Sequence, residues 1–285
     1  MTILFDGVAY GMILFILAVG LSVTLGLMNV INLAHGAFAM AGGYIAVVLA
    51  QKFGLSLFVG MVAAFLATAI AGALLERTLY VRLYDKSHLD QVLFTIGLTF
   101  MAMAVADHLM GASPQIVNPP AVLEGSVRIG GVSVNAYRLF IIVLCGALTA
   151  LLQLGLSGTR IGAQLRAAVD NARAARGLGI DVRRLFGLTF ALGSGLAGLA
   201  GALGAPVLSI DPNFPLKYMI YFLIVVAVGG TSTIAGPFLA SILLGVADVT
   251  GKYYAPSVGG FLIYTIMVVI LILRPQGLFG RVKTR

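Results

Sequence analysis

Long apolar runs without a charged side chain dominate the chain. Because a membrane-spanning helix needs about 20 such residues, these runs predict an all-α, polytopic bundle of membrane helices. The pattern predicts a single transmembrane domain over 1–285. The runs cover 7–51, 53–75, 91–106, 139–159, 185–210, 218–247 and 253–273.

Two of the runs do not fit a single crossing. Run 7–51 is long enough for two helices, with a break near 28–32. Run 218–247 is long for one helix and short for two, so we expect two short helices that meet near 231–236 and either cross twice or re-enter. Non-helical backbone at such depth is tolerated only where protein or a cavity covers it. The total expected is about eight or nine segments. The interruptions in 218–247 are Gly229-Gly230-Thr231-Ser232 and Gly236-Pro237.

Composition supports a membrane protein. Hydrophobic residues make up 60% of the chain and charged residues 10%, and the mean hydropathy is +1.06. A soluble domain carries roughly 25% charged residues. These values exclude a cytosolic enzyme, a disordered tail and a disulfide scaffold. The single cysteine, Cys145, lies in an apolar run, and we interpret it as a packing residue.

The placement of positive charge predicts the topology. The net charge is +8, and segments 76–90, 160–184 and 274–285 hold three, six and four Lys or Arg, against five elsewhere. By the positive-inside rule these three segments are cytoplasmic. The N-terminus is then outside, the C-terminus is cytoplasmic, and 111–137 is the longest outer loop. The basic excess is therefore interpreted as membrane topology, with no nucleic-acid partner.

The most polar stretch inside the spans is a candidate pathway or gate. Asn29, Asn32 and His35 are spaced three apart, so on a helix they would share one face, and Gly36 follows. Two hypotheses stay open: these side chains touch the transported molecule, or they only hydrogen-bond neighbouring helices. A second candidate is the other interrupted segment, because paired interrupted helices point to a transport site. Its residues are Gly229, Gly230, Thr231 and Ser232.

Ionisable side chains are nearly absent from the spans, which bears on the energy source. Ion-coupled carriers usually keep a carboxylate at depth, whereas Asp107 and Asp248 are expected at the outer interface. We therefore expect another subunit to supply the energy for uphill transport. A secondary carrier, a passive channel and a non-transport scaffold are the competing hypotheses.

The cytoplasmic loop 160–184 is expected to dock onto another protein. Residues 163–176 are Ala-rich and predict a helix on which Arg166, Asp170 and Arg173 share one face. Gly177 is placed to end that helix, and Asp181 to cap the next span. Small side chains favour a protein groove over the lipid surface, where a large apolar face is usual.

These segments carry a resemblance to a known family. Gly-x-x-Asn-x-x-Asn-x-Ala-His-Gly-x-Phe-x-Met at 26–40 resembles the N-terminal signature of permeases from branched-chain amino acid ABC importers. Residues 160–180 are similar to the coupling loop of the same family. The likeness covers nearly the whole chain, which looks like the shorter of the two paired permeases. Further matches are Glu76-Arg77, Thr95-Ile96-Gly97-Leu98, Pro114-Gln115, Tyr137-Arg138, Gly229-Gly230 with Gly236, and Arg274-Pro275-Gln276-Gly277-Leu278-Phe279-Gly280.

The resemblance implies a set of partners. It implies a second homologous permease, two cytoplasmic ATPase subunits that bind ATP and Mg, and a periplasmic or lipid-anchored substrate-binding protein. It also implies that the chain is a multi-pass protein of a bacterial or archaeal plasma (inner) membrane. Heterodimer and homodimer both stay open. The chain lacks Gly-x-x-x-x-Gly-Lys-[Ser/Thr], the segment that cradles ATP phosphates. We therefore expect no catalytic residue, cofactor or metal in this chain.

The resemblance also suggests the role of each region. The chain would be a single permease domain over 1–285, with 111–137 outside and 160–184 as the coupling loop. The substrate would be a branched-chain or other hydrophobic amino acid, with urea, short amides or small carboxylates as alternatives. The residues implied in ATPase coupling are Arg166, Asp170, Arg173, Arg176, Gly177 and Gly179.

Overall fold

The structure is a computed structural model that describes residues 2–28, 30–84, 86–129, 131–230 and 233–279. Nearly all of the described chain is helical, apart from one short hairpin. The helices are α1 (Thr2–Met28), α2 (His35–Phe53), α3 (Leu57–Thr78), α4 (His88–Met110), α5 (Ala136–Gly158), α6 (Arg160–Asp170), α7 (Ala172–Gly177), α8 (Val182–Leu208), α9 (Phe214–Gly229), α10 (Ala235–Tyr254) and α11 (Gly259–Leu273), with 3₁₀ turns η1 (Tyr80–Arg82) and η2 (Ala121–Leu123) and strands β1 (Ser126–Ile129) and β2 (Val132–Asn135).

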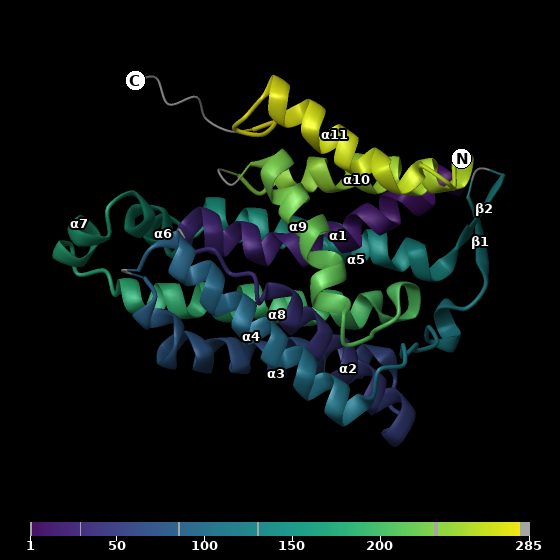
Figure 1. Ribbon diagram of the computed structural model, residues 1–285, viewed down its shortest axis with the longest axis horizontal. Coiled ribbons are helices and arrows are strands. Elements are labelled where there is room, and N and C mark those ends of the chain that lie inside the picture. Colours follow the sequence, from purple (N-terminus) through teal and green to yellow (C-terminus); the bar gives the residue numbers. More distant parts are fainter. Residues whose placement is uncertain (1, 29, 85, 130, 231–232, 280–285) are drawn as a thin grey trace.

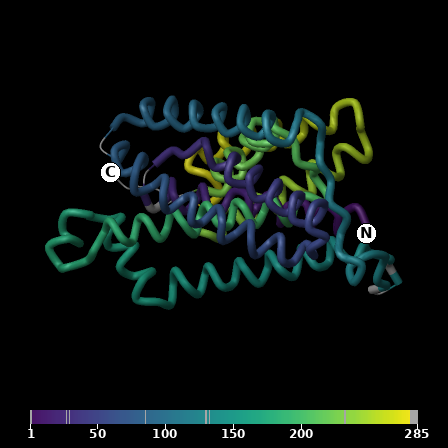
Figure 2. Tube along the Cα trace, turned by 90° about the horizontal axis from the view of Figure 1, so that it is seen from below, coloured from purple at the N-terminus to yellow at the C-terminus, as the bar shows by residue number. Residues whose placement is uncertain are grey.

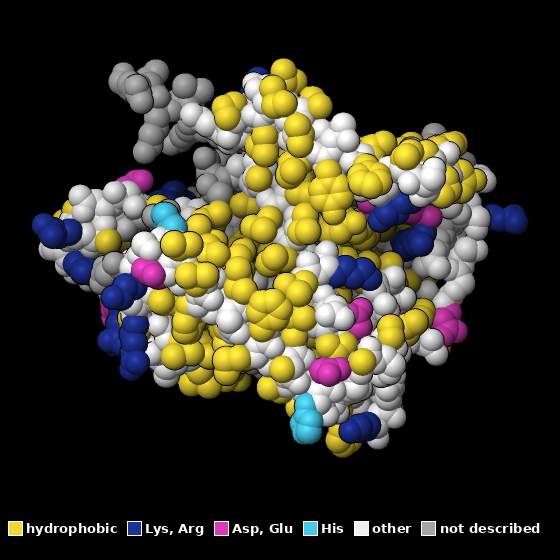
Figure 3. Space-filling model, in the orientation of Figure 1, with side chains coloured by type: hydrophobic (Ala, Val, Ile, Leu, Met, Phe, Trp, Pro, Cys, Tyr) yellow, Lys and Arg dark blue, Asp and Glu magenta, His cyan; other side chains and the backbone are white. Residues whose placement is uncertain are grey.

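The fold is the expected polytopic membrane bundle. Within the described residues, six helices are long and apolar enough to cross a membrane, namely α1, α2, α3, α4, α5 and α8. Helices α9 and α11 are shorter and also apolar. Figure 3 shows hydrophobic side chains over the middle of one face and Lys and Arg toward its two ends. The count of eight or nine crossings and the sides on which the two termini lie stay predictions.

Both overlong runs divide into two helices, as expected. The first divides into α1 and α2, and the second into α9 and α10. The second run is nevertheless longer than expected, because α10 continues through Asp248 and Lys252 to Tyr254. These two opposite charges stand four residues apart on the helix and pair at 2.6 Å, which allows the helix to continue through them. Helix α11 accordingly begins at Gly259 rather than at 253.

Helices α1 and α8 form the centre of the bundle. Every residue from Ile13 to Val19 in α1 exposes 1% of its surface or less. Helix α1 packs along α8 and α10, while α8 also packs along α2 and α3. Helix α9 crosses the bundle obliquely and contacts α1, α2, α10 and α11 (Figure 1). Helices α4 and α5 lie at the periphery and expose apolar side chains.

The two ends of the bundle differ. The N-terminus and the β1–β2 hairpin lie at one end, and α6 and α7 project from the other (Figures 1 and 2). The hairpin is antiparallel, with Val127 opposite Val134, and Gln115 forms an isolated bridge with Ile210. The segment 111–137 therefore closes the N-terminal end against the end of α8.

Glycines bring α2 and α8 into backbone contact. A Cβ atom added at Gly201 would lie 1.8 Å from the carbonyl oxygen of Ala39, and one added at Gly42 would lie 2.1 Å from that of Gly198. Small residues that let helix backbones approach are the usual basis of helix association in membranes. These glycines therefore set the distance between the two helices.

We predict that Gly201→Ala lowers the stability of the chain by about 1 to 3 kcal/mol, since α2 and α8 must separate to admit the methyl group. The matched control is Gly146→Ala in α5, where an added Cβ meets nothing within 4 Å. The control should be neutral or slightly more stable. Thermal unfolding of both variants in detergent measures the difference, and equal melting temperatures would contradict the packing described.

Candidate functional site

The break between α1 and α2 is satisfied by side chains of α4. The N–H of Ile31 donates to Oε1 of Gln91 at 3.2 Å, and the N–H of Leu33 donates to Oγ1 of Thr95 at 3.2 Å. Oγ1 of Thr99 lies 3.4 Å from the carbonyl oxygen of Leu33. Because an unpaired backbone group is costly in a membrane, these bonds allow the chain to leave the helical conformation inside the bundle.

The three α4 side chains form a buried polar stripe. Gln91, Thr95 and Thr99 are four residues apart and expose 2% or less of their surface. The opposite side of α4 exposes large apolar residues such as Leu93 and Phe100. Sequence analysis missed this stripe and noted Thr95 only as part of a family match. The available signal was the spacing of four between polar residues in an otherwise apolar run.

Asn32 and His35 form hydrogen bonds to other parts of the bundle. The hydroxyl of Tyr80 donates to Oδ1 of Asn32 at 2.8 Å, and Nε2 of His35 lies 2.9 Å from the carbonyl oxygen of Leu17, so we assign the proton to Nε2. Both residues are 1% exposed. The His35 ring also meets Phe222 of α9 edge to face, with centroids 5.8 Å apart. These contacts are structural, and a role in the pathway stays a prediction.

One expectation about this stretch is wrong. Asn32 and His35 do not share a helical face, because α1 ends at Met28 and α2 begins only at His35. Asn32 belongs to the non-helical connection, which is why its backbone carbonyl is free to accept from the N–H of His35. Gly36 packs against the start of α9, where an added Cβ would lie 2.9 Å from Cα of Pro215. Asn29 lies outside the described residues.

The second break, between α9 and α10, is covered by the segment that follows α11. Gly229 ends α9, Gly230 has a positive φ of 80°, and an added Cβ at Gly229 would lie 2.4 Å from the nitrogen of Pro237. The N–H of Leu278 donates to the carbonyl oxygen of Val228 at 2.7 Å. The break is thus held by residues near the C-terminus, whereas α4 and η1 hold the first one. Thr231 and Ser232 lie outside the described residues.

The loop expected to dock consists of two helices, which corrects the expected single helix over 163–176. Oδ1 of Asn171 accepts from the N–H of Ala174 at 2.9 Å and starts α7 as a separate helix. Arg166 and Asp170 lie four residues apart in α6 and share a face, whereas Arg173 lies in α7, so the prediction that all three share one helical face is wrong. The α7 helix also ends one residue later than expected. Gly177 is its last residue, and Gly179, with φ of 81°, makes the left-handed turn.

The charged side chains of α6 and α7 differ in whether they contact the rest of the bundle. Arg166 donates to the carbonyl oxygen of Leu156 and so braces α6 against the end of α5. Asp170, Arg173 and Arg176 are exposed. The expected cap of α8 is confirmed, since Oδ1 of Asp181 accepts from the N–H of Arg184 at 3.0 Å. The exposed charges are therefore free to contact another protein.

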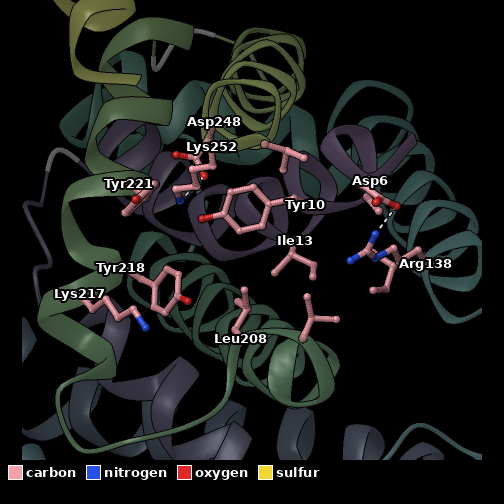
Figure 4. A pocket seen from close by; sticks show the side chains of 14 residues that line it. Asp6, Tyr10, Ile13, Arg138, Leu208, Lys217, Tyr218, Tyr221, Asp248 and Lys252 are labelled. Atoms are coloured by element: carbon pink, nitrogen blue, oxygen red, sulfur yellow. Dashed lines mark hydrogen bonds and ion pairs between the residues drawn. The ribbon is translucent and has the colours of Figure 1, made fainter. Parts of the chain in front are cut away.

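A cavity of about 440 Å³ with several charged residues in its lining lies at the opposite end of the bundle, among the ends of α1, α5, α8, α9 and α10 (Figure 4). Asp248 lies in its wall and is 2% exposed at its side chain. Helices therefore cover Asp248, whereas its expected place at the outer membrane interface stays a prediction. Sequence reasoning missed this cavity because its charged residues come from distant segments.

Apolar helices long enough to span a membrane, with two internal breaks held by other segments, are typical of a membrane transport protein of the permease type. The family model described as "Branched-chain amino acid transport system / permease component" matches residues 3–271. The chain belongs to this family, as its resemblance implied.

Individual relatives agree with the family. BraD of Pseudomonas aeruginosa, a high-affinity branched-chain amino acid transport system permease protein, is 30% identical over 98% of this chain and 95% of BraD. The probable branched-chain amino acid transport permease protein LivH of Methanocaldococcus jannaschii is 28% identical over 98% of this chain and 92% of that LivH. LivM of Escherichia coli is 28% identical over 94% of this chain but only 68% of LivM. No solved structure matches the chain.

We predict that Tyr80→Phe and Asn32→Ala each destabilise the chain by about 1 to 3 kcal/mol, because each leaves a buried polar partner without its hydrogen bond. The double variant should lose less than the sum of the two, by about 1 kcal/mol. Thermal unfolding of the three variants in detergent gives the coupling. Tyr253→Phe, at a tyrosine that is 64% exposed, is the control. Strict additivity would show that the two side chains do not interact.

Proposed function

We propose that this chain is the transmembrane permease subunit of an ATP-driven importer of the ABC type. It forms the translocation pathway for branched-chain or other hydrophobic amino acids delivered by a substrate-binding protein. The observation that carries the proposal is the family match over residues 3–271. The names of the relatives support the substrate class.

The proposal assigns the energy source to other subunits. Two buried carboxylates have protein partners: Glu76 accepts from the hydroxyl of Tyr84 at 2.5 Å, and one oxygen of Asp248 pairs with Lys252. Burial, together with the bond to Glu76, raises the pKa of Tyr84, so its hydroxyl keeps the proton that it donates. ATP and Mg are bound by two cytoplasmic ATPase subunits, and this chain is no enzyme and holds no cofactor or metal.

The exposed end formed by α6 and α7 is the proposed ATPase contact. Its surface combines the charges of Asp170, Arg173 and Arg176 with Leu178, which is 80% exposed. When the ATPase subunits close on ATP, this helix pair moves as a lever and switches the pathway between its inward- and outward-facing forms. The bond from Arg166 to Leu156 transmits that movement to α5.

The second permease is a related chain. The match to LivM, which is longer than this chain, supports a pairing between a short and a long member of the family. The complex also includes a periplasmic or lipid-anchored substrate-binding protein and lies in the plasma (inner) membrane. Its surrounding lipid contacts the apolar faces of α4 and α5.

Purification of the tagged chain from its native membrane in mild detergent tests this proposal. Recovery of an ATPase and a second permease, followed by ATP-dependent uptake of leucine into proteoliposomes, is expected. Uptake of urea or a short amide in place of leucine would keep the architecture and change the substrate. A chain that is recovered alone and moves solute without ATP would contradict the proposal in favour of a carrier or channel.

We predict that the double variant Asp170→Ala/Arg173→Ala lowers ATP-driven uptake at least tenfold, because two charge-assisted contacts to the ATPase are lost, each worth about 1.5 to 3 kcal/mol. Membrane insertion should be unchanged, since both side chains are exposed. Uptake by the reconstituted complex is the measurement.

The control for that variant is Arg82→Ala/Lys86→Ala, which removes two exposed charges outside the docking helices. It should retain uptake. Full uptake by the Asp170→Ala/Arg173→Ala variant would rule out these side chains as the ATPase contact.

A further inference from the structure

The cavity at the N-terminal end has an acidic floor and a basic mouth. Side-chain exposure rises from 2% at Asp248 to 23% at Asp6, 37% at Arg138 and 50% at Lys252. Lys217, also in the lining, is exposed. An approaching molecule therefore meets cations first and a buried carboxylate last.

Asp248 has an unused oxygen at the floor. Its Oδ2 accepts from Nζ of Lys252 at 2.6 Å, but its Oδ1 is buried and has no hydrogen-bond partner among the described residues. Leaving a buried acceptor unsatisfied is costly, and more so for a charged group. This oxygen is suited to a donor supplied by a bound molecule, and an ammonium group is the donor that best matches a carboxylate.

Aromatic rings extend the acidic floor toward the middle of the cavity. The rings of Tyr10 and Tyr221 lie 6.0 and 5.9 Å from Nζ of Lys252. Figure 4 shows Tyr10 between the Asp248–Lys252 pair and the Asp6–Arg138 pair. Ring faces attract cations, and here both rings already face the ammonium of Lys252, so the preference of the floor for a ligand ammonium rests on the unpartnered Oδ1 of Asp248.

The mouth provides a partner for an anion. Lys217 lies with Nζ 5.4 Å from the centroid of the Tyr218 ring and forms no ion pair with a described carboxylate. Arg138 is paired with Asp6, yet a guanidinium carries five N–H donors and retains some of them for a second acceptor. A carboxylate group therefore fits at the mouth.

The remaining wall is apolar, with Ala9, Ile13 and Leu208 in the lining. We propose that this cavity binds a small zwitterionic α-amino acid with an apolar side chain, with its ammonium at Oδ1 of Asp248, its carboxylate toward the mouth where Lys217 has no ion pair among the described residues, and its side chain against α1 and α8. A volume of about 440 Å³ lies within the range of small-molecule sites. The proposal deepens the proposed function and rests on it, since it places an outer substrate site in the permease itself.

Equilibrium binding of radiolabelled L-leucine to the full chain in lipid nanodiscs tests the site. The wild type should bind leucine, and neither 4-methylpentanoate, which lacks the ammonium, nor isopentylamine, which lacks the carboxylate, should compete at equal concentration. Asp248→Asn should weaken binding at least tenfold. The control is Asp107→Asn, an exposed acidic residue of α4 outside the cavity, which should bind as the wild type does.

A second variant tests the apolar wall of the cavity, and the melting temperature of each variant in detergent checks that it folds. Ala9→Leu adds bulk to the lining without changing a charge and should also weaken leucine binding at least tenfold. If the wild type binds leucine and both Asp248→Asn and Ala9→Leu bind it equally well, the site is overturned. The site is also overturned if the wild type binds no leucine. Full competition by isopentylamine would reduce it to a cation site and overturn the zwitterion proposal.

ATP-driven uptake by the assembled complex separates the two proposals. Uptake that persists unchanged with Asp248→Asn in the permease would overturn the cavity site and leave the importer assignment intact. Absence of ATP-driven uptake by the wild-type complex would instead overturn the importer assignment, whatever the cavity binds.

Discussion

The need to satisfy every backbone polar group inside a membrane is the constraint on which this structure depends. The chain leaves helical geometry twice within the bundle, and each departure is matched by donors and acceptors from elsewhere. Gln91 and Thr95 on α4 accept from the backbone of the first connection, and Leu278 donates to the end of α9 at the second. Without these partners each break would leave N–H or C=O groups in an apolar medium. The breaks therefore determine which segments must stay in contact.

A rigid centre links the two ends of the bundle for which functions are proposed. Helices α1 and α8 are buried along most of their length, and glycine contacts fix α8 against α2. The cavity at the N-terminal end is lined by α1, α5, α8, α9 and α10, whereas α6 and α7 join α5 to the opposite end of α8. In the proposed mechanism, a movement imposed at α6 and α7 reaches the cavity through α5, which contacts α1, and through α8, whose close packing against α1, α2 and α3 resists local deformation.

Apolar run length predicted where the helices lie, but not how their polar residues are used. The break after Met28 was predictable because 45 charge-free residues exceed one crossing. The prediction that Asn32 and His35 share a helical face was wrong, because residues three apart share a face only where the backbone between them is helical. The single helix over 163–176 was wrong because helix propensity neglects the capping bond of Asn171. The burial of Asp248 was missed because it depends on the packing of α10 against helices from distant parts of the chain.

Amide hydrogen exchange in lipid nanodiscs tests most directly whether α4 holds the first break. The amides of Ile31 and Leu33 should exchange slowly in the wild type and at least tenfold faster in Gln91→Ala/Thr95→Val, while exchange within α8 stays the same. Fast exchange at Ile31 and Leu33 in the wild type, or unchanged exchange in the variant, would contradict the account that side chains of α4 replace the missing helical hydrogen bonds.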